Sequence, residues 1–316
     1  MTQHLLFIFF FGILLALGAH LVLRSALSLA HKFGIASYVM GFVILGLLTS
    51  TPELFVAIQS VISGVPQVSV GNLLGGSILL FSLLLGLSSV GLGKITLNHG
   101  LALREMALSA AVIAAPVFIL WDGTLSRIDG AFLVGFYFLH TLFIQGGKHS
   151  LAGFSRRARS ARHIAWYMGQ LIVGIIVVAI AARLMVNRVE LLASGIGIPD
   201  FLLGLFLVSI GTNLPEAALV VTGAMERRRT VAFADILGSA AANTLFLGLL
   251  GLVTPFRLME PAMLRFSLAI LAGTIVYFLW TVSSKRDITR YEGIGFLFFY
   301  ALFLAYEVYG GLSLLP

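Results

Sequence analysis

The chain contains no cysteine, so disulfide bonds and thiolate metal sites are excluded. Charged residues are also scarce, at 10% of 316 residues, whereas ordinary soluble domains are roughly a quarter charged. Hydrophobic residues make up 59% of the chain, and the mean hydropathy is +1.04. A soluble fold cannot bury this much apolar surface, so the composition predicts a membrane protein.

Motifs of several other protein classes are missing as well. The chain has no His-Glu-x-x-His sequence of an intramembrane metalloprotease, and it has no phosphate-binding glycine loop followed by Lys-Ser or Lys-Thr. No pairing of a serine with a histidine stands out. The net charge of +7 comes mostly from short loops between apolar runs, which favours membrane orientation over nucleic-acid binding. We therefore expect no enzyme, no cofactor and no nucleic-acid partner.

Apolar runs of about 20 residues recur along the whole chain, and this length crosses roughly 30 Å of hydrocarbon as a helix. We predict an all-α polytopic membrane protein with ten transmembrane helices. They cover residues 4–24, 36–62, 67–92, 104–121, 129–146, 164–186, 199–224, 231–254, 262–283 and 291–311. The polar segment 147–163 separates a first half of five spans, 1–146, from a second half of five spans, 164–316.

The basic residues predict the orientation. If 147–163 is cytoplasmic, 15 of the 20 Lys and Arg residues fall on the cytoplasmic side, where positive charge is favoured. The five exceptions are Arg127, Arg183, Arg188, Arg257 and Arg265. We predict a cell (inner) membrane protein with a basic cytoplasmic linker and both termini outside. Because each half has an odd number of spans, the halves must cross the membrane in opposite senses.

A short sequence occurs once in each half. Residues 49–53 read Thr-Ser-Thr-Pro-Glu, and residues 212–216, at an offset of 163 residues, read Thr-Asn-Leu-Pro-Glu. The same offset relates Asn-Leu-Leu-Gly at 72–75 to Asp-Ile-Leu-Gly at 235–238. The two repeat motifs extend over 41–90 and 204–253. They predict two inverted five-helix repeats, a design that places a binding site near mid-membrane between the halves.

The residues of this motif suit a cation. Proline removes a helix hydrogen bond, so both helices are expected to break near Pro52 and Pro215. Backbone carbonyls of the preceding turns, near Gly46 and Ser209, can then face a cavity. Further oxygens come from the side chains of Thr49, Ser50, Glu53, Thr212, Asn213 and Glu216. A hard cation such as Ca²⁺ prefers such a set of oxygen ligands.

The two glutamates need a reason to lie in the membrane. An ionised carboxylate at mid-span costs about 2.5–3.5 kcal/mol even on lenient insertion scales. Glu53 and Glu216 occupy equivalent positions of the repeat, and no span centre holds a basic partner. A transported cation supplies the reason, with simple kinks and ion pairing as the structural alternative. The glycines Gly75, Gly76 and Gly238 are expected to allow close approach of neighbouring helices.

These segments resemble the α-repeats of the calcium/cation antiporter superfamily, which includes the sodium/calcium exchangers and their bacterial relatives. The resemblance is close over the two repeat motifs, and the layout of five plus five spans extends it to the rest. It implies a secondary transporter that exchanges Ca²⁺ for Na⁺ or H⁺ by alternating access. It also implies that spans 4–24 and 164–186 slide across the other eight. Their small residues Gly12, Gly18, Gly169 and Gly174 suit such sliding.

The resemblance further implies a ligand set. Glu53 and Glu216 match the two central carboxylates, and Thr49 and Thr212 match the ligands one turn before them. These four residues are the expected metal ligands. Further cation-binding candidates are Ser50, Asn213, Ser239, Asn243, Ser77, Asn72 and Asp235, with Gly46 and Ser209 as candidate carbonyls.

Several positions depart from the family pattern. The second repeat has Ser239 in its Gly-Ser pair, but the first has Gly76, so a ligand is missing unless Ser77 substitutes. Four residues further on, where the family has Asn or Asp, the chain has Leu80 in the first half and Asn243 in the second. These changes remove oxygens around one Na⁺ position and leave the carboxylate core intact.

Two other repeat pairs are unequal. Ser50 matches a hydroxyl ligand, and its counterpart Asn213 is a bulkier oxygen donor. Asn72 matches the family's usual asparagine, whereas its counterpart is Asp235. Asp235 is expected either to attract a cation or proton, or to cap the start of its helix. Glu307, near the end of the last span, is expected at the membrane interface.

The predicted function is secondary active antiport of Ca²⁺ for Na⁺. Because neither carboxylate tolerates being bare in a dry site, access is expected to alternate only when the charge is matched. Antiport of Ca²⁺ or another cation for H⁺ by the same glutamates is the alternative, and a non-transporting scaffold or a membrane enzyme is the alternative of another class. The expected partners are the transported cations and the lipid bilayer. The sequence leaves open the coupling ion, stoichiometry, selectivity, direction and oligomeric state.

Overall fold

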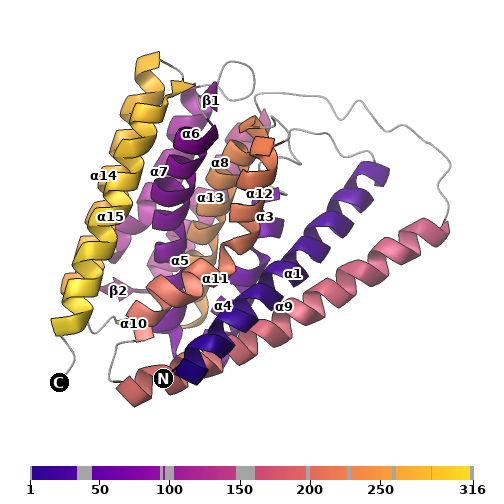
Figure 1. Ribbon diagram of the computed structural model, residues 1–316, viewed down its shortest axis with the longest axis horizontal. Helices are drawn as coiled ribbons and strands as arrows, with labels where there is room; N and C mark the ends of the chain where they lie inside the picture. Colours follow the sequence, from indigo (N-terminus) through magenta and orange to yellow (C-terminus); the bar gives the residue numbers. More distant parts are fainter. Residues whose placement is uncertain are drawn as a thin grey trace.

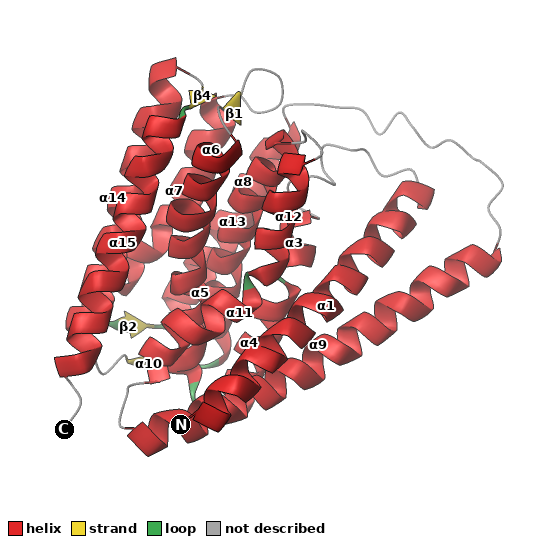
Figure 2. Ribbon diagram, viewed as in Figure 1, coloured by secondary structure: helices red, strands yellow, loops and turns green. Residues whose placement is uncertain are grey.

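The computed structural model of the chain describes residues 2–33, 45–92, 95–96, 103–146, 161–196, 200–225, 229–257, 261–285 and 287–313. Within these ranges almost every residue is helical (Figures 1 and 2). The start of the predicted second span, and with it the start of the first repeat motif, lies outside the described residues. So do most of the linker 147–163 and Arg227 and Arg228.

The two halves present their elements in the same order. The first half consists of α1 (Thr2–Phe33), α3 (Leu45–Thr49), α4 (Thr51–Ile62), α5 (Pro66–Ile78), the π-helical η2 (Leu79–Leu84), α6 (Leu85–Leu92), β1 (Ile95–Thr96), α7 (Leu103–Ile119), the 3-10 turn η3 (Leu120–Asp122), β2 (Thr124–Leu125) and α8 (Arg127–Gly146). The second half consists of α9 (Ala161–Ile196), α10 (Asp200–Leu203), the π-helical η4 (Gly204–Val208), α11 (Ser209–Thr212), α12 (Leu214–Met225), α13 (Arg229–Val253), β3 (Phe256–Arg257), α14 (Pro261–Lys285), β4 (Asp287–Ile288) and α15 (Arg290–Ser313).

Every predicted span corresponds to a helix or a broken helix, although fewer qualify as spans by length and hydropathy. Six described helical stretches are long and apolar enough to cross a membrane, and the bent pair Asp200–Thr212 and Leu214–Val220 makes a seventh. The other three predicted spans correspond to α3 with α4, to α8 and to α15, which are helical but fall short of those limits.

Helices α1 and α9 lie side by side at one edge of the bundle (Figure 1). Both are longer than predicted, because charged residues such as Arg24 and Arg188 mark the expected membrane boundary and do not end the helix. Only 39% and 33% of their most apolar stretches are buried, compared with 83% for Pro66–Gly91 and for Ala232–Val253. The latter two stretches therefore form the centre of the bundle.

Glycines allow the central helices to cross with backbone in contact. A Cβ atom on Gly71 would lie 2.0 Å from the carbonyl oxygen of Phe201, and one on Gly75 would lie 2.2 Å from that of Leu205. The equivalent crossing in the other half brings α3 against α13, where a Cβ on Gly46 would lie 2.5 Å from the carbonyl carbon of Gly238. The predicted close approach at Gly75 and Gly238 is confirmed, whereas Gly76 faces side chains.

Two small sheets show the inversion directly. β1 pairs antiparallel with β4, and β2 pairs antiparallel with β3, so each sheet joins one half to the other. In the chain order of the halves, β1 corresponds to β3 and β2 corresponds to β4. The β1–β4 sheet and β2 lie at opposite ends of the molecule (Figure 2). This is the arrangement that two halves of opposite orientation produce.

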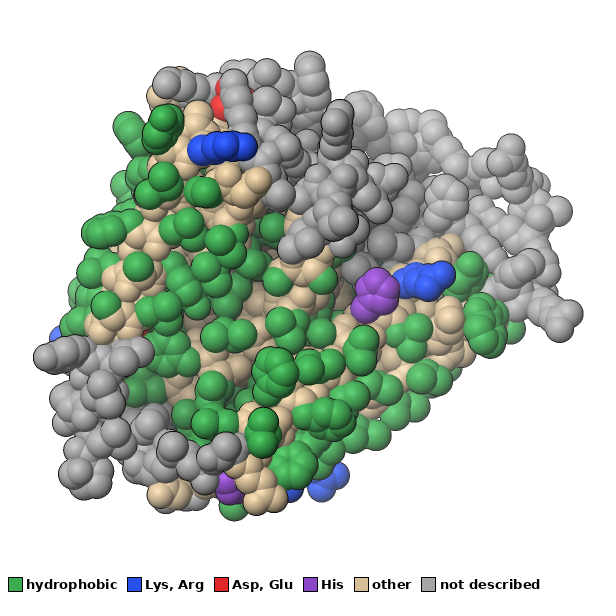
Figure 3. All heavy atoms as spheres, viewed as in Figure 1, with side chains coloured by type: hydrophobic (Ala, Val, Ile, Leu, Met, Phe, Trp, Pro, Cys, Tyr) green, Lys and Arg blue, Asp and Glu red, His purple; other side chains and the backbone are tan. Residues whose placement is uncertain are grey.

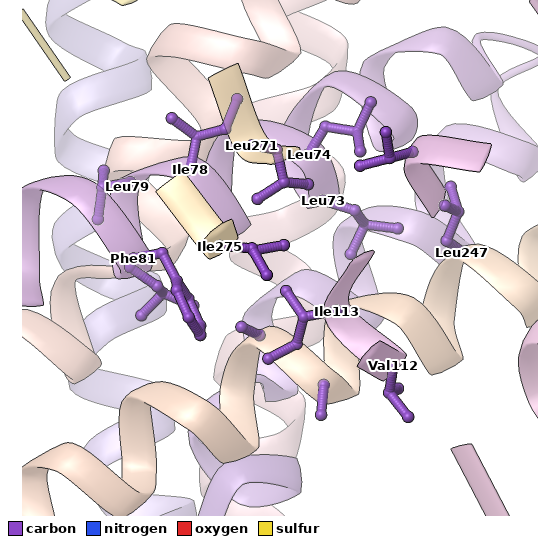
Figure 4. Close-up of a cluster of buried hydrophobic side chains, with 14 of the residues drawn as sticks. Leu73, Leu74, Ile78, Leu79, Phe81, Val112, Ile113, Leu247, Leu271 and Ile275 are labelled. Atoms are coloured by element: carbon purple, nitrogen blue, oxygen red, sulfur yellow. The ribbon is translucent and has the colours of Figure 1, made fainter. Parts of the chain in front are cut away.

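A large apolar cluster surrounds the central helices. Side chains of α5 and η2, among them Leu73, Ile78 and Phe81, pack against Ile113 of α7 and Leu271 of α14 (Figure 4). The outer surface is also largely apolar, and the face seen in Figure 3 shows few charged side chains. Apolar groups outside as well as inside are expected for a chain whose solvent is lipid.

Candidate functional site

The helix of each repeat motif breaks near its proline, as predicted, two residues before it. Ser50 separates α3 from α4 with φ −77° and ψ 17°, and Asn213 separates α11 from α12 with φ −87° and ψ 11°. Both conformations belong to the sparsely populated bridge region, where many active-site residues lie. The second break bends the helix by 45°. Pro52 and Pro215 occupy the second position of the following helix, where a missing N–H costs nothing.

The expectation that these prolines free the carbonyls of Gly46 and Ser209 is wrong. Each of these oxygens still accepts the backbone N–H four residues on, from Ser50 and Asn213, at 3.2 Å. Proline removes the donor for the carbonyl four residues before it, which in the first half is that of Leu48. The Thr51 hydroxyl replaces that donor, at 2.6 Å from the Leu48 oxygen. Gly46 can therefore offer a cation only a second lone pair, and at Ser209 that lone pair accepts the Asn213 side-chain amide at 2.9 Å.

The two glutamate side chains meet in the protein interior. Glu53 and Glu216 are at most 1% exposed, and none of their four carboxylate oxygens has a hydrogen-bond partner. Their charges are close enough to repel each other, and Asp235 adds a third negative group. Each glutamate lies in the first turn of its helix, α4 or α12, where the positive end of the helix dipole offsets part of this repulsion.

The threonines of the motif pair across the two halves. The Thr49 hydroxyl donates to the Asp235 Oδ1 atom at 3.1 Å, and the Thr212 hydroxyl donates to the Asn72 Oδ1 atom at 2.9 Å. Thr212 also lies beside Glu53, and Thr49 lies beside Glu216. Since a hydroxyl has a single proton, the threonine oxygens next to the glutamates are suited to accept rather than donate.

Asp235 does not cap its helix, so that alternative is wrong. It lies nearly two turns beyond Arg229, the first residue of α13, and its side chain is fully buried. Its Oδ1 atom accepts from Thr49, and its Oδ2 atom has no partner. The constant offset of 163 residues could have predicted this position of Asp235. Equivalent residues of an inverted repeat make equivalent contacts, so a pair of Thr212 with Asn72 implies a pair of Thr49 with Asp235.

The surroundings of Gly76 differ from those of Ser239. Ser239 lies 2.9 Å from the Thr49 hydroxyl. At Gly76 the nearest polar atom to a Cβ position is the Asn213 Nδ2 atom, at 2.8 Å. Ser77 does not replace the missing hydroxyl there, because it donates to the Leu73 carbonyl and accepts from Asn243 at 3.3 Å. Leu80 is fully buried and brings no oxygen to this side.

Two further buried polar pairs lie on other helices. His140 of α8 lies 2.9 Å from Ser109 of α7, a Ser–His pair that the sequence does not reveal. Both are at most 3% exposed, so no substrate reaches them. Glu307 is not interfacial as expected. It is fully buried, and the Ser267 hydroxyl of α14 donates to its Oε1 atom at 2.6 Å, which reduces the cost of burial.

The donor set defines what this centre can bind. Among the described residues, no three His, Cys, Asp or Glu side chains are close enough to hold a metal ion by themselves. A cation here must therefore share the carboxylates with hydroxyl and amide oxygens. Such a mixed set of hard oxygen atoms, with no basic side chain in an ion pair with them among the described residues, suits Ca²⁺ and Na⁺.

Comparison with known proteins adds independent information. A family model described as "Sodium/calcium exchanger protein" matches residues 3–145 and again residues 166–309. The two matches start 163 residues apart, which is the offset of the repeat motif. Together they cover most of the chain.

Named relatives are similar over nearly their full length. "Inner membrane protein YrbG" of Escherichia coli (strain K12) is 29% identical, with 90% of each chain covered. "Putative antiporter CaxA" of Alkalimonas amylolytica is 28% identical, covering 89% of this chain and 91% of the relative. "Sodium/calcium exchanger MaX1" of Methanosarcina acetivorans is 25% identical, covering 94% and 96%.

A solved structure shares the fold. The sodium-calcium exchanger NCX_Mj, soaked with Na⁺ and Sr²⁺, superposes with a TM-score of 0.68 over 96% of this chain and 99% of its own. The two sequences are 23% identical. At that identity the likeness establishes the ten-helix inverted-repeat architecture and does not by itself assign ions.

Proposed function

Because this chain belongs to the sodium/calcium exchanger protein family, we propose that it exchanges Ca²⁺ for Na⁺ across the membrane by alternating access. It is a membrane transporter and not an enzyme, because its family and its structural neighbours are transporters. The observation that carries the proposal is the pair of buried carboxylates without hydrogen-bond partners, Glu53 and Glu216, contributed by two inverted halves.

Charge matching accounts for exchange in this proposal. Two carboxylates that face each other away from water are unfavourable without positive charge. One Ca²⁺ satisfies both, and monovalent cations can do the same in its place. Thr49 and Thr212 supply hydroxyl oxygens beside Glu216 and Glu53. The carrier then changes its open side only when the pair is neutralised, which couples the two ion movements.

The α1–α9 pair is the proposed moving part. A Cβ on Gly18 would lie 2.8 Å from the Val178 side chain, and one on Gly174 would lie 3.0 Å from the Val22 backbone nitrogen. These two glycines therefore join α1 to α9, whereas Gly169 has no neighbour within 4 Å of a Cβ position. One close contact with the core is at Gly12, whose added Cβ would lie 3.2 Å from the Gly211 Cα atom, and apolar side chains of α1 and α9 also pack against Val56 of α4 and Val208 of η4. A contact between two glycines offers little resistance to sliding.

Flux measurements test this function. In proteoliposomes with an outward Na⁺ gradient, the wild-type protein is expected to accumulate ⁴⁵Ca²⁺. Glu53→Gln and Glu216→Gln keep the shape of the side chain and remove its charge, so each should abolish uptake. Glu307→Gln, which alters a buried carboxylate outside the site, is the matched control and should retain uptake. Wild-type uptake rates in either central variant would overturn the assignment.

Exchange of Ca²⁺ for H⁺ is the second candidate. It is favoured by the third acidic side chain, Asp235, and by Gly76 and Leu80, which bring no oxygens to the other side of the site. Imposing a pH gradient without Na⁺, and a Na⁺ gradient at equal pH, separates the two. Uptake driven only by the pH gradient would show that the coupling ion is H⁺ and not Na⁺. The proposed roles of Glu53 and Glu216 would be unchanged.

We propose that the halves 1–146 and 164–316 are joined by a cytoplasmic linker in the cell (inner) membrane, with both termini outside. The distribution of Lys and Arg supports this orientation. Because the chain has no cysteine, single cysteines can report it without background. A membrane-impermeant maleimide should label Thr124→Cys in β2 on intact cells and Ser150→Cys in the linker only in inverted vesicles. The reverse pattern would invert the orientation.

A further inference from the structure

We propose that the central site binds cations on one side only, because the Asn213 carboxamide fills the position on the Gly76 side. Asn213 would then set how many monovalent ions compete with Ca²⁺. This inference rests on the proposed function and specifies it further. It follows from comparing residues related by the repeat, since two inverted halves should otherwise offer two equivalent cation positions flanking the glutamates.

The side near Ser239 retains its acceptor oxygens. Ser50, at the helix break, is 1% exposed, and its hydroxyl has no hydrogen-bond partner. The Gly46 carbonyl accepts the Ser50 backbone N–H at 3.2 Å and keeps its second lone pair, because the Thr49 hydroxyl proton goes to Asp235. Ser239 and the Oδ2 atom of Asp235, which also has no partner, complete this side. It therefore combines hydroxyl, carbonyl and carboxylate oxygens, a set that a cation prefers.

On the Gly76 side, one amide nitrogen occupies the corresponding oxygens. The Asn213 Nδ2 atom donates to the Ser209 carbonyl at 2.9 Å and to the Thr212 hydroxyl oxygen at 3.3 Å. The same carbonyl also accepts the backbone N–H of Asn213 at 3.2 Å. A carbonyl oxygen has two lone pairs, so these donors leave it no capacity for a cation.

The same nitrogen excludes a side chain at position 76. A Cβ on Gly76 would lie 2.8 Å from Asn213 Nδ2 and 3.2 Å from Asn243 Nδ2. Glycine at 76 and asparagine at 213 therefore fit each other, whereas the equivalent positions on the opposite side are both serines, Ser239 and Ser50. Of the polar atoms nearest to position 76, the two closest are N–H donors, which repel a cation. Apart from the carboxylate oxygens of Glu53, the acceptor without a partner described on this side is the Asn243 Oδ1 atom.

Exchanging the residues between the sides tests this proposal. The variant Gly76→Ser/Asn213→Ser copies the Ser239 side onto the Gly76 side, and Ser50→Asn/Ser239→Gly makes the reverse copy. The single variant Gly76→Ser is the control for the steric fit and should bind more weakly than the double variant. Binding of ⁴⁵Ca²⁺ to the full-length detergent-purified protein is measured at increasing Na⁺ concentration, with K⁺ replacing Na⁺ to hold ionic strength constant.

For the wild type we expect shallow displacement of Ca²⁺ by Na⁺, with a Hill coefficient of about one. In Gly76→Ser/Asn213→Ser the displacement should become steeper, with a coefficient of about two. Ser50→Asn/Ser239→Gly should raise the Kd for Ca²⁺ roughly tenfold or more, because the remaining acceptor side is then blocked. A purely structural role for Asn213 predicts changes in stability without a change in steepness.

Three results would overturn the inference: steep displacement already in the wild type, an unchanged curve in the first double variant, or unchanged Ca²⁺ affinity in the reverse copy. If the first double variant does not fold, the wild-type curve and the reverse copy still decide. Absence of any Ca²⁺ binding to the wild type would instead contradict the proposed function. The two failures are therefore distinguishable.

Discussion

The two halves agree in backbone and differ in chemistry. Each breaks a helix one residue after a threonine, each places a glutamate in the next turn, and each crosses its partner through glycine. Yet the two repeats carry different residues at equivalent positions: Ser50 is equivalent to Asn213, and Asn72 is equivalent to Asp235. The difference teaches that a pseudo-symmetric backbone preserves the geometry needed for alternating access, while the side chains on its two sides are free to take different roles.

The largest expected effect tests the shared backbone. Gly71→Ala and Gly46→Ala would each push a methyl group into backbone atoms of the opposite half, at 2.0 Å and 2.5 Å. Overpacking typically costs about 1–3 kcal/mol, and no rotamer change can relieve a backbone clash, so we expect the upper end or more. Size-exclusion chromatography and thermal unfolding should show loss of folded protein in both. Gly135→Ala, with open space around it, should be neutral; an equal loss there would mean that crossing distance is not the cause.

The second-largest effect is expected for Asp235 and its repeat counterpart Asn72. Asp235→Asn makes the two sides alike at this position and removes a negative charge from the site. Because the ion is divalent, loss of this nearby negative charge should weaken Ca²⁺ binding by roughly tenfold or more. Asn72→Asp, the reverse change, should not cause such a loss. Isothermal titration with Ca²⁺ measures both variants, and equal affinities would show that Asp235 does not contribute to the cation site.

A smaller effect is expected to distinguish Thr49 from Thr212. Thr49→Val leaves the carboxylate of Asp235 without its donor, whereas Thr212→Val leaves a neutral amide oxygen without one. Hydrogen bonds to charged groups contribute about 1.5–3 kcal/mol and neutral ones about 1 kcal/mol. Thr49→Val should therefore lower the thermal midpoint and the Ca²⁺ affinity more than Thr212→Val. The opposite ranking would argue that Asp235 is not ionised in the Ca²⁺-free protein.

The smallest expected effect lies outside the central comparison. Glu307 is buried like the central glutamates, but it already accepts a hydrogen bond from Ser267 and lies on α15. Ser267→Ala should destabilise the protein by about 1–3 kcal/mol, because it leaves the carboxylate without a donor. Ca²⁺ affinity in the same preparation should be unchanged within error. A change in affinity would connect this pair to the site.

Much of this architecture follows from the sequence. Hydropathy and the constant offset predicted ten helices in two inverted halves, and the structure and its likeness to NCX_Mj confirm that fold. The same offset predicted that Glu53 and Glu216 meet, and the structure buries both within range of each other's charge. These features depend on periodicity and on repeated motifs, which can be recognised in a single sequence. The assignment of the site residues to cation binding stays a prediction.

Other features required side-chain geometry. Sequence cannot show that Thr51 supplies the donor that Pro52 lacks, or that the Asn213 amide turns back onto Ser209. The readings of Asp235 as a cap and of Glu307 as interfacial were wrong because both relied on distance from a predicted helix end. Helices here continue beyond their apolar stretches, so a position in the sequence does not give a depth in the fold.

The two small sheets also bear on how the halves hold together. Each pairs a strand of one half with a strand of the other, and they do so at opposite ends of the bundle. These two strand pairs and the glycine crossings between them are direct contacts between the halves, so the halves hold each other at both ends of the bundle and along its centre.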